Sequence, residues 1–229
     1  MRRKIKKKIK AILCDVDGTF IDSFIRGLYK LRLAAEAAGY VYDEELEQRA
    51  VAAWGNPLVP LLEHCFPDAT SETINGMVEL FTIHDMDNPP NAIAGVHAVF
   101  EFLASLGIVF TVVTSRDSES LDRILKNEQL DHHFIHVATA DTVEHKKPDP
   151  RVFDCTIRLL AERGITPDEC ILIGDTNDDW HAGKNFGMRT VIVRTGPLHG
   201  VRDHIPAEDH IDSFADLPEW LERNNLLAA

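Results

Sequence analysis

Strand-sized apolar runs alternate with helix-periodic segments along much of this 229-residue chain. Residues 11–14, 108–113 and 171–173 form nearly continuous apolar runs, which is typical of strands buried on both faces of a sheet. Apolar residues also recur at helical spacing before the second and third runs. These residues are Val96, Phe100, Leu103 and Leu106, followed by Val152, Ile157 and Leu160. The alternation predicts an α/β fold with a doubly wound parallel sheet.

Residues 24–89 interrupt this alternation. They contain no long strand-like run and are rich in Ala, Glu and Leu, which predicts a helical bundle. Asp22-Ser23 and Asn88-Pro89-Pro90 flank the segment and are the candidate hinges. We therefore predict an α/β core formed by residues 1–23 and 90–229, with an inserted helical domain at 24–89.

Two carboxylates follow the first predicted strand. Asp15 and Asp17 stand one residue apart, and Gly18 lets the chain turn directly after them. Both carboxylates can then face one reacting centre, an arrangement that indicates phosphoryl transfer. Taken alone, residues 11–19 fit a polar turn after a buried strand equally well.

Later segments supply the partners that an aspartate nucleophile needs. Thr114 and Ser115 follow the second strand and offer hydroxyl and backbone N–H groups to phosphate oxygens. Lys147 precedes a stiff Pro-Asp-Pro loop, from which its ammonium group can reach a phosphate. The third strand is followed by acids from Asp175 to Asp179, and such oxygen ligands suit Mg²⁺.

These motifs, in this order, resemble those of the haloacid dehalogenase-like hydrolase superfamily, specifically its phosphoglycolate phosphatase-like branch. The four motifs are Asp15-Val16-Asp17-Gly18-Thr19, Thr114-Ser115, Lys147-Pro148, and Gly174-Asp175 with Asp179. The resemblance spans roughly residues 10–217. It implies a Rossmann-like core, a helical cap at 24–89, and Mg²⁺-dependent hydrolysis of a phosphoric monoester.

The resemblance also implies a role for each motif residue. Asp15 is the expected nucleophile that forms an aspartyl-phosphate, and Asp17 the expected general acid and base. Thr114, Ser115 and Lys147 are expected to bind the phosphoryl oxygens. The expected Mg²⁺ ligands are Asp15, Asp175 and the backbone carbonyl of Asp17, with Asp179 in support.

The sequence departs from the family pattern at two places and offers two lysines at a third. Phe20 and Ser115-Arg116 depart from the residues usual in the family, and we expect these changes to affect substrate fit more than the reaction. Lys146 stands beside Lys147, and we assign the role to Lys147 because it directly precedes the proline.

Charge and composition limit which binding partners and which cellular location we expect. Residues 1–10 carry seven Lys or Arg, which leaves 17 basic and 37 acidic residues, a net charge of −20, in the remainder. The basic arm is interpreted as a solvated extension, and the acidic body disfavours nucleic acid. No apolar run is long enough for a membrane span or a signal peptide, and the four cysteines show no Cys-x-x-Cys pair. We predict a cytoplasmic enzyme, monomeric or homodimeric, without membrane contact.

The substrate is predicted to be a small phosphorylated metabolite resembling phosphoglycolate. A β-phosphoglucomutase-like phosphomutase, a pyrophosphatase and a nucleotidase remain alternatives, because they would use the same core residues. A binding module that has lost catalysis is the alternative outside enzymology. Within the cap, the loop Trp54-Gly55-Asn56-Pro57 is either a specificity loop or a turn whose tryptophan packs into the cap core.

Overall fold

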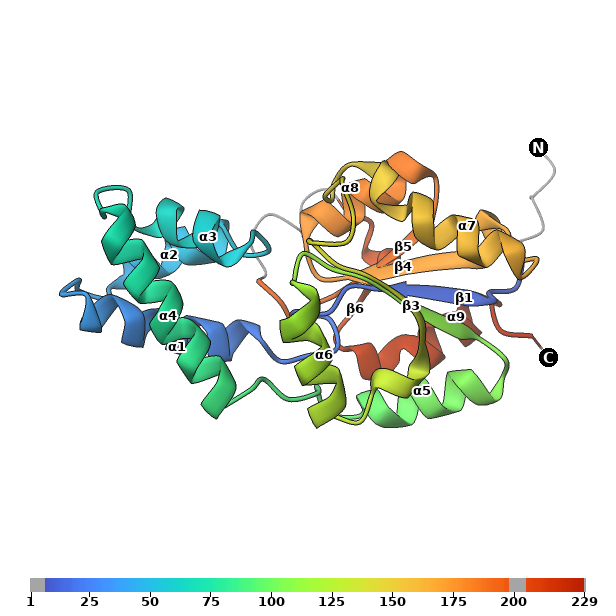
Figure 1. Ribbon diagram of the computed structural model, residues 1–229. Coiled ribbons are helices and arrows are strands. Elements are labelled where there is room, and N and C mark those ends of the chain that lie inside the picture. Colours follow the sequence, from blue (N-terminus) through green and yellow to red (C-terminus); the bar gives the residue numbers. More distant parts are fainter. Residues whose placement is uncertain (1–6, 198–204, 229) are drawn as a thin grey trace.

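The computed structural model describes residues 7–197 and 205–228, which form an α/β core beside a group of four helices (Figure 1). The core contains a six-stranded sheet with the order β3-β2-β1-β4-β5-β6, and every neighbouring pair of strands is parallel. The strands are β1 (Ala11–Cys14), β2 (Val109–Val113), β3 (Phe134–Ala138), β4 (Cys170–Gly174), β5 (Arg189–Val193) and β6 (His210–Ile211). The predicted doubly wound parallel sheet is confirmed.

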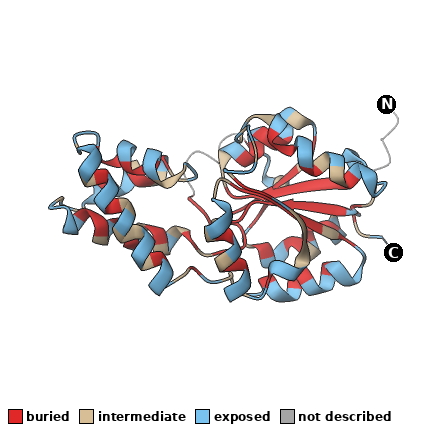
Figure 2. Cartoon of the chain, in the orientation of Figure 1, coloured by how far each residue is buried: buried red, intermediate tan, exposed pale blue. Residues whose placement is uncertain are grey.

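Helices cover both faces of this sheet (Figure 1). One face packs against α5 (Val96–Ser105), α6 (Ser118–Asn127) and α9 (Leu217–Arg223), and the other against α7 (Asp154–Glu162) and α8 (Asn177–Phe186). Figure 2 shows most of the sheet buried between the two layers, whereas the outer faces of the helices, the loops and part of the edge strand β3 are not buried. This burial explains why the strands read as continuous apolar runs.

Two details of the predicted elements differ from the structure. Leu106 continues the apolar stripe of the helix before β2, but α5 ends at Ser105 and Leu106 is 43% exposed. The chain turns at Gly107, whose φ of +80° favours glycine, and so the stripe ends one turn early. The strands β5 and β6 were not predicted.

The inserted segment folds into four helices with a separate apolar core. They are α1 (Phe24–Ala37), α2 (Glu44–Ala52), α3 (Leu58–Cys65) and α4 (Ser71–Asp87). Their shared core includes Leu31, Leu46, Leu62 and Met77. The helical cap is confirmed as part of the fold, and Figure 1 shows it beside one end of the sheet.

Two adjacent connecting segments join the cap to the core. The backbone N–H of Asp22 donates to the carbonyl of Asn91 at 2.9 Å, and Ile21 forms an isolated antiparallel bridge with Ala92. Arg26 donates from Nη1 to the carbonyl of Pro89 at 3.2 Å, which ties the start of α1 to the returning chain. These contacts lie at the predicted hinges, and the domain limits at 23/24 and 89/90 stay a prediction.

Two expectations concern the chain outside the core and cap. Most of the basic arm, residues 1–6, lies outside the described residues, whereas Lys7 and Lys10 form ion pairs with Asp168 and Glu169 on the core surface. Within residues 7–197 and 205–228, we find no helix with the length and apolar character that crossing a membrane requires.

Candidate active site

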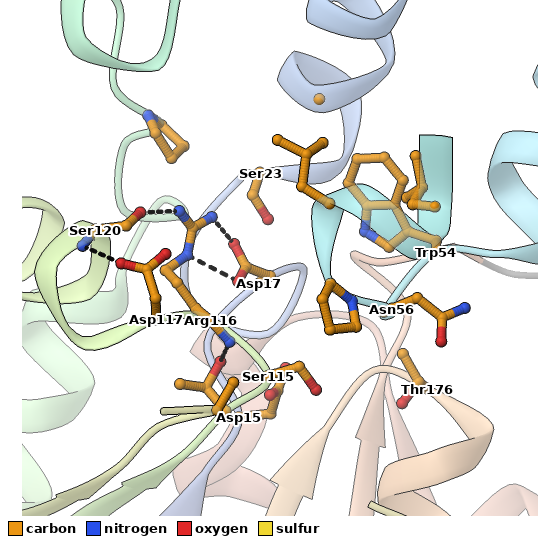
Figure 3. Close-up of a pocket in the computed structure, with 18 of the residues that line it drawn as sticks. Asp15, Asp17, Ser23, Trp54, Asn56, Ser115, Arg116, Asp117, Ser120 and Thr176 are labelled. Carbon is orange, nitrogen blue, oxygen red and sulfur yellow. Dashed lines mark hydrogen bonds and ion pairs between the residues drawn. The ribbon is translucent and has the colours of Figure 1, made fainter. Parts of the chain in front are cut away.

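The candidate site lies where the chain order of the sheet reverses, at the carboxyl ends of β1 and β4. Asp15 follows β1, Thr114 follows β2 and Asp175 follows β4, so the parallel register brings all three to one edge. Ligands of doubly wound sheets bind at this kind of switch point. A cavity of about 710 Å³ opens here, lined by these core residues and by cap residues that include Trp54 and Asn56 (Figure 3).

Lys147 connects two carboxylates at the floor of the cavity. Its Nζ donates to Oδ1 of Asp15 and to Oδ1 of Asp179, each at 2.6 Å, and to the carbonyl of Val113 at 3.1 Å. Its side chain is only 6% exposed. Burial alone would lower the pKa of Lys147, but the two carboxylates outweigh this effect and raise it. Lys147 therefore stays protonated, while Lys146 is exposed to solvent.

Asp179 is held by the first turn of α8. Its Oδ2 accepts from the hydroxyl of Thr176 at 2.6 Å and from two backbone N–H groups, and Thr176 caps the helix in return. Since Oδ1 accepts from Lys147, both oxygens of Asp179 already have protein donors. Asp179 therefore connects the first turn of α8 to Lys147.

Asp15 is a buried carboxylate beside other carboxylates. Burial raises its pKa to about 7, and repulsion from Asp179 and Asp17 adds to this effect, while Lys147 opposes it. Among the described residues, the one hydrogen bond that its Oδ2 accepts is a long one of 3.4 Å from the hydroxyl of Thr19. One oxygen of Asp15 is therefore fixed by Lys147, and the other is weakly held.

The surroundings of the Asp175 carboxylate show whether a cation can bind there. Its side chain is buried, and Oδ2 has no hydrogen-bond partner within the described residues. A Cβ placed on Gly18 or Gly196 would lie 2.3 Å or 1.7 Å from that oxygen, so two glycines leave the space around it open. Burial and the neighbouring carboxylates Asp15 and Asp179 raise the pKa of Asp175.

Asp15, Asp175 and Asp179 place carboxylate oxygens within 4.8 Å of one another. Hard oxygen donors with an unpaired buried oxygen and excess negative charge fit Mg²⁺. Because the oxygens of Asp179 already accept hydrogen bonds, Asp15 and Asp175 are the side chains best placed to hold the ion.

Asp17 faces a different partner. The Arg116 guanidinium grips it with two hydrogen bonds, from Nε to Oδ2 at 3.0 Å and from Nη2 to Oδ1 (Figure 3). Burial alone would raise the pKa of Asp17, but the charge and the hydrogen bonds of Arg116 outweigh this and lower it. The predicted general acid is therefore ionised and occupied in this arrangement.

The remaining motif residues also meet at the cavity. Thr114 is buried, its N–H donates to the carbonyl of Ala138, and its Oγ1 accepts from the N–H of Arg116 at 3.2 Å. Ser115 lines the cavity beside it. All the sequence-predicted site residues thus lie around one cavity.

Several residues that shape this site were not predicted from the sequence. Thr19 contacts both Asp15 and Asp175, and Gly196 gives the Asp175 carboxylate its space. Arg116 was treated only as a departure from the family pattern, although its place directly after Thr114-Ser115 put it within reach of the site.

The cap loop at Trp54 combines both interpretations given from the sequence. Trp54 packs edge-on against Phe24 at 5.0 Å and covers Gly27, and it also lines the cavity.

Comparison with known proteins agrees with this arrangement. Residues 12–193 match the family described as haloacid dehalogenase-like hydrolases. The chain is 29% identical over 194 residues to the pyrophosphatase PpaX of Bacillus velezensis, covering 82% of this chain and 84% of the relative. It is 29% identical over 191 residues to a phosphoglycolate phosphatase of Aquifex aeolicus, covering 82% and 86%.

A solved structure supports the fold. The crystal structure of a predicted phosphoglycolate phosphatase from Haemophilus somnus superposes with a TM-score of 0.77 at 20% identity. The superposition covers 92% of this chain and 97% of the other.

Proposed function

Because the chain belongs to the haloacid dehalogenase-like hydrolases, we propose that it is a phosphatase that hydrolyses a small phosphorylated metabolite through an aspartyl-phosphate on Asp15. The observation that carries the proposal is the constellation at the cavity floor. Asp15 is a buried carboxylate with one weakly held oxygen, and it lies beside the protonated Lys147. Nearby, Asp175 has a carboxylate oxygen without a hydrogen-bond partner among the described residues. Such a group is suited to attack a phosphoryl group rather than only to bind one.

In the first step, an Asp15 oxygen attacks phosphorus and the bond to the leaving oxygen breaks. Asp17 donates its proton to that oxygen, so the product leaves as an alcohol or acid. Lys147 and the Thr114 hydroxyl hold phosphoryl oxygens as charge develops on them. For this step, Asp17 must first separate from Arg116 and take up a proton.

In the second step, Asp17 takes a proton from water as the water oxygen attacks phosphorus. The bond between phosphorus and Asp15 breaks, which releases phosphate and restores the Asp15 carboxylate. Mg²⁺ held by Asp15 and Asp175 would supply positive charge that offsets repulsion between the nucleophile and the phosphate. The cap loop at Trp54 covers the cavity and would limit the entry of other water molecules.

The substrate we propose is a phosphoglycolate-like monoester. Pyrophosphate is the second candidate, because the matched relatives include a pyrophosphatase as well as a phosphoglycolate phosphatase. Both compounds carry a second anionic group close to the scissile bond, and the cavity of about 710 Å³ is large enough for either.

The test is phosphate release with Mg²⁺ from phosphoglycolate, pyrophosphate, sugar phosphates and nucleotides. Wild-type protein should turn over at least one compound, and Asp15→Asn should be inactive on all of them. Asp122→Asn is the matched control, because Asp122 is an exposed residue whose ion pair, in the part of the chain that the structure describes, is with Lys126. Equal activity of wild type and Asp15→Asn would refute the proposed nucleophile. Interconversion of β-glucose phosphates without phosphate release would instead favour the phosphomutase alternative.

A further inference from the structure

Arg116 has hydrogen-bonding capacity that the protein does not use. A guanidinium offers five N–H donors. Three are accounted for by the two bonds to Asp17 and by a 2.6 Å bond from Nη1 to the hydroxyl of Ser120. The nearest further anion is Asp85, whose Oδ2 lies 3.8 Å from Nη1, too far for a hydrogen bond. One N–H on each terminal nitrogen is therefore left without a described partner.

The same wall of the cavity carries more cations than its buried carboxylates neutralise. Lys30 and Arg123 also line it, and Lys30 forms a close ion pair with Asp85. Arg123 lies 3.9 Å from Asp85 and has a buried Nε with no hydrogen-bond partner in residues 7–197 and 205–228. Three cations thus surround two carboxylates, Asp17 and Asp85.

Other acids near this wall do not change that balance much. Asp117 and Glu119 line the cavity too, but both are exposed to water at the start of α6. Exposed carboxylates compensate buried cations weakly, because water screens them. The wall is therefore able to accept another anion.

The position of Arg116 also ties up the proposed acid. Both oxygens of Asp17 accept from the guanidinium, so neither is available to a leaving oxygen while that grip persists (Figure 3). A new anion in front of the two unused N–H groups gives the guanidinium an alternative partner. Arg116 is anchored at Ser120, in the first turn of α6, so it can turn towards such an anion without leaving the cavity.

We propose that Arg116, supported by Lys30 and Arg123, forms a subsite for a second oxyanion on the substrate, and that occupying this subsite releases Asp17 for the reaction. The ligand chemistry is a carboxylate or a second phosphoryl group adjacent to the scissile phosphate. This inference rests on the proposed phosphatase function and deepens it. It predicts that the enzyme prefers phosphate esters that carry a second anionic group over esters of the same size whose remaining part is uncharged.

The test compares three substrates with Mg²⁺. Phosphoglycolate carries a carboxylate, pyrophosphate carries a second phosphoryl group, and ethyl phosphate is a neutral-tailed ester similar in size to phosphoglycolate. In wild type, kcat/KM for the better of the two anionic substrates should exceed that for ethyl phosphate by about 10- to 100-fold, as expected for a charge-assisted bidentate contact. Which of the two is better identifies the source of the oxyanion.

Substitution at the subsite should remove this preference. In Arg116→Gln the ratio should fall to near 1, because both the binding group and the grip on Asp17 are lost. Arg116→Lys keeps the positive charge but loses the planar guanidinium that can donate two parallel hydrogen bonds, and it should give an intermediate ratio. Arg32→Gln is the matched control, since Arg32 is an exposed arginine that pairs with Glu36 outside the cavity lining, and its loss should leave the ratio intact.

A second measurement separates failure of the subsite from failure of the phosphatase. Calorimetric binding of phosphoglycolate and ethyl phosphate to Asp15→Asn, with and without Arg116→Gln, needs no turnover. Loss of the tighter phosphoglycolate binding on Arg116→Gln supports the subsite even if no substrate is hydrolysed. A wild-type ratio near 1, or an unchanged ratio and affinity in Arg116→Gln, would overturn it, whereas an inactive wild type with Arg116-dependent binding would count only against the proposed function.

Discussion

Replacing Asp15 by asparagine should abolish activity and at the same time stabilise the metal-free protein at alkaline pH. The wild-type carboxyl has a pKa of about 7 in the folded protein, against 3.8 as its ordinary value. The folded state therefore favours the protonated carboxyl, which asparagine imitates. The stability that belongs to the protonated form is complete below pH 4 and is lost as the pH rises through 7.

The size of the effect follows from this difference. A displacement of about three pKa units corresponds to about 4 kcal/mol at 1.36 kcal/mol per unit. Asp15 is 6% exposed, so solvent screens little of this energy. The free energy of unfolding of Asp15→Asn should thus match that of wild type near pH 4 and exceed it by about 4 kcal/mol near pH 8.

Urea unfolding at pH 4, 6 and 8 with a chelator present measures this difference. Mg²⁺ should then stabilise wild type more than Asp15→Asn, because only wild type offers the ion a second ionised carboxylate. Asp122→Asn controls for the loss of a surface carboxylate and should show no such trend. The reasoning is refuted if Asp15→Asn is destabilised at pH 8 or if its advantage does not grow with pH.

Three further substitutions test the surroundings. Lys147→Met leaves Asp15 and Asp179 buried without a cation, and should cost about 3–5 kcal/mol in urea unfolding as well as activity. Gly196→Ala would place a Cβ 1.7 Å from Oδ2 of Asp175, so the Mg²⁺ concentration for half-maximal activity should rise about tenfold or more. Gly76→Ala, on the exposed face of α4 with nothing within 4 Å, is its control and should stabilise by about 1 kcal/mol with unchanged Mg²⁺ dependence. Gly27→Ala would place a Cβ 2.1 Å from the Trp54 ring, and thermal unfolding should show a loss of about 1–3 kcal/mol.

The strand ends were predictable because their signal is local. Asp15, Thr114 and Asp175 each stand at the point where a buried apolar run ends, and a parallel sheet brings such points to one edge. Hydrophobic continuity and one polar residue are enough to recognise each position. The cap was predictable for a similar reason, since a long stretch without strand-like runs cannot enter the sheet.

The partners of Asp17 were not predictable in this way. Arg116 lies 99 positions away in the sequence, and the Lys30–Asp85 pair joins α1 to α4 across 55 positions. Nothing in the local pattern indicates that these side chains converge, because Arg116 meets Asp17 only once β1 and β2 have paired, and Lys30 meets Asp85 only once α1 and α4 have packed together. Likewise, β5 and β6 were missed, although the Thr190–Val193 run has a β-branched character that could have indicated β5.

The two walls of the cavity carry opposite imbalances of charge. On the floor, Lys147 is a single cation among three buried carboxylates, which leaves a site that attracts a divalent cation. On the facing wall, the cations around Asp85 outnumber their buried partners, which leaves a site that attracts an oxyanion.

A substrate that carries a phosphoryl group at one end and a second anion at the other would satisfy both walls only in one orientation. That orientation places phosphorus over Asp15 and turns the second anion towards Arg116. Arg116 holds Asp17 until another anion binds to the guanidinium. A correctly oriented substrate therefore releases Asp17 as it binds. An ester without the second anion could bind at the floor, but it would lack the group that frees Asp17, so we expect discrimination to appear in kcat as well as in KM.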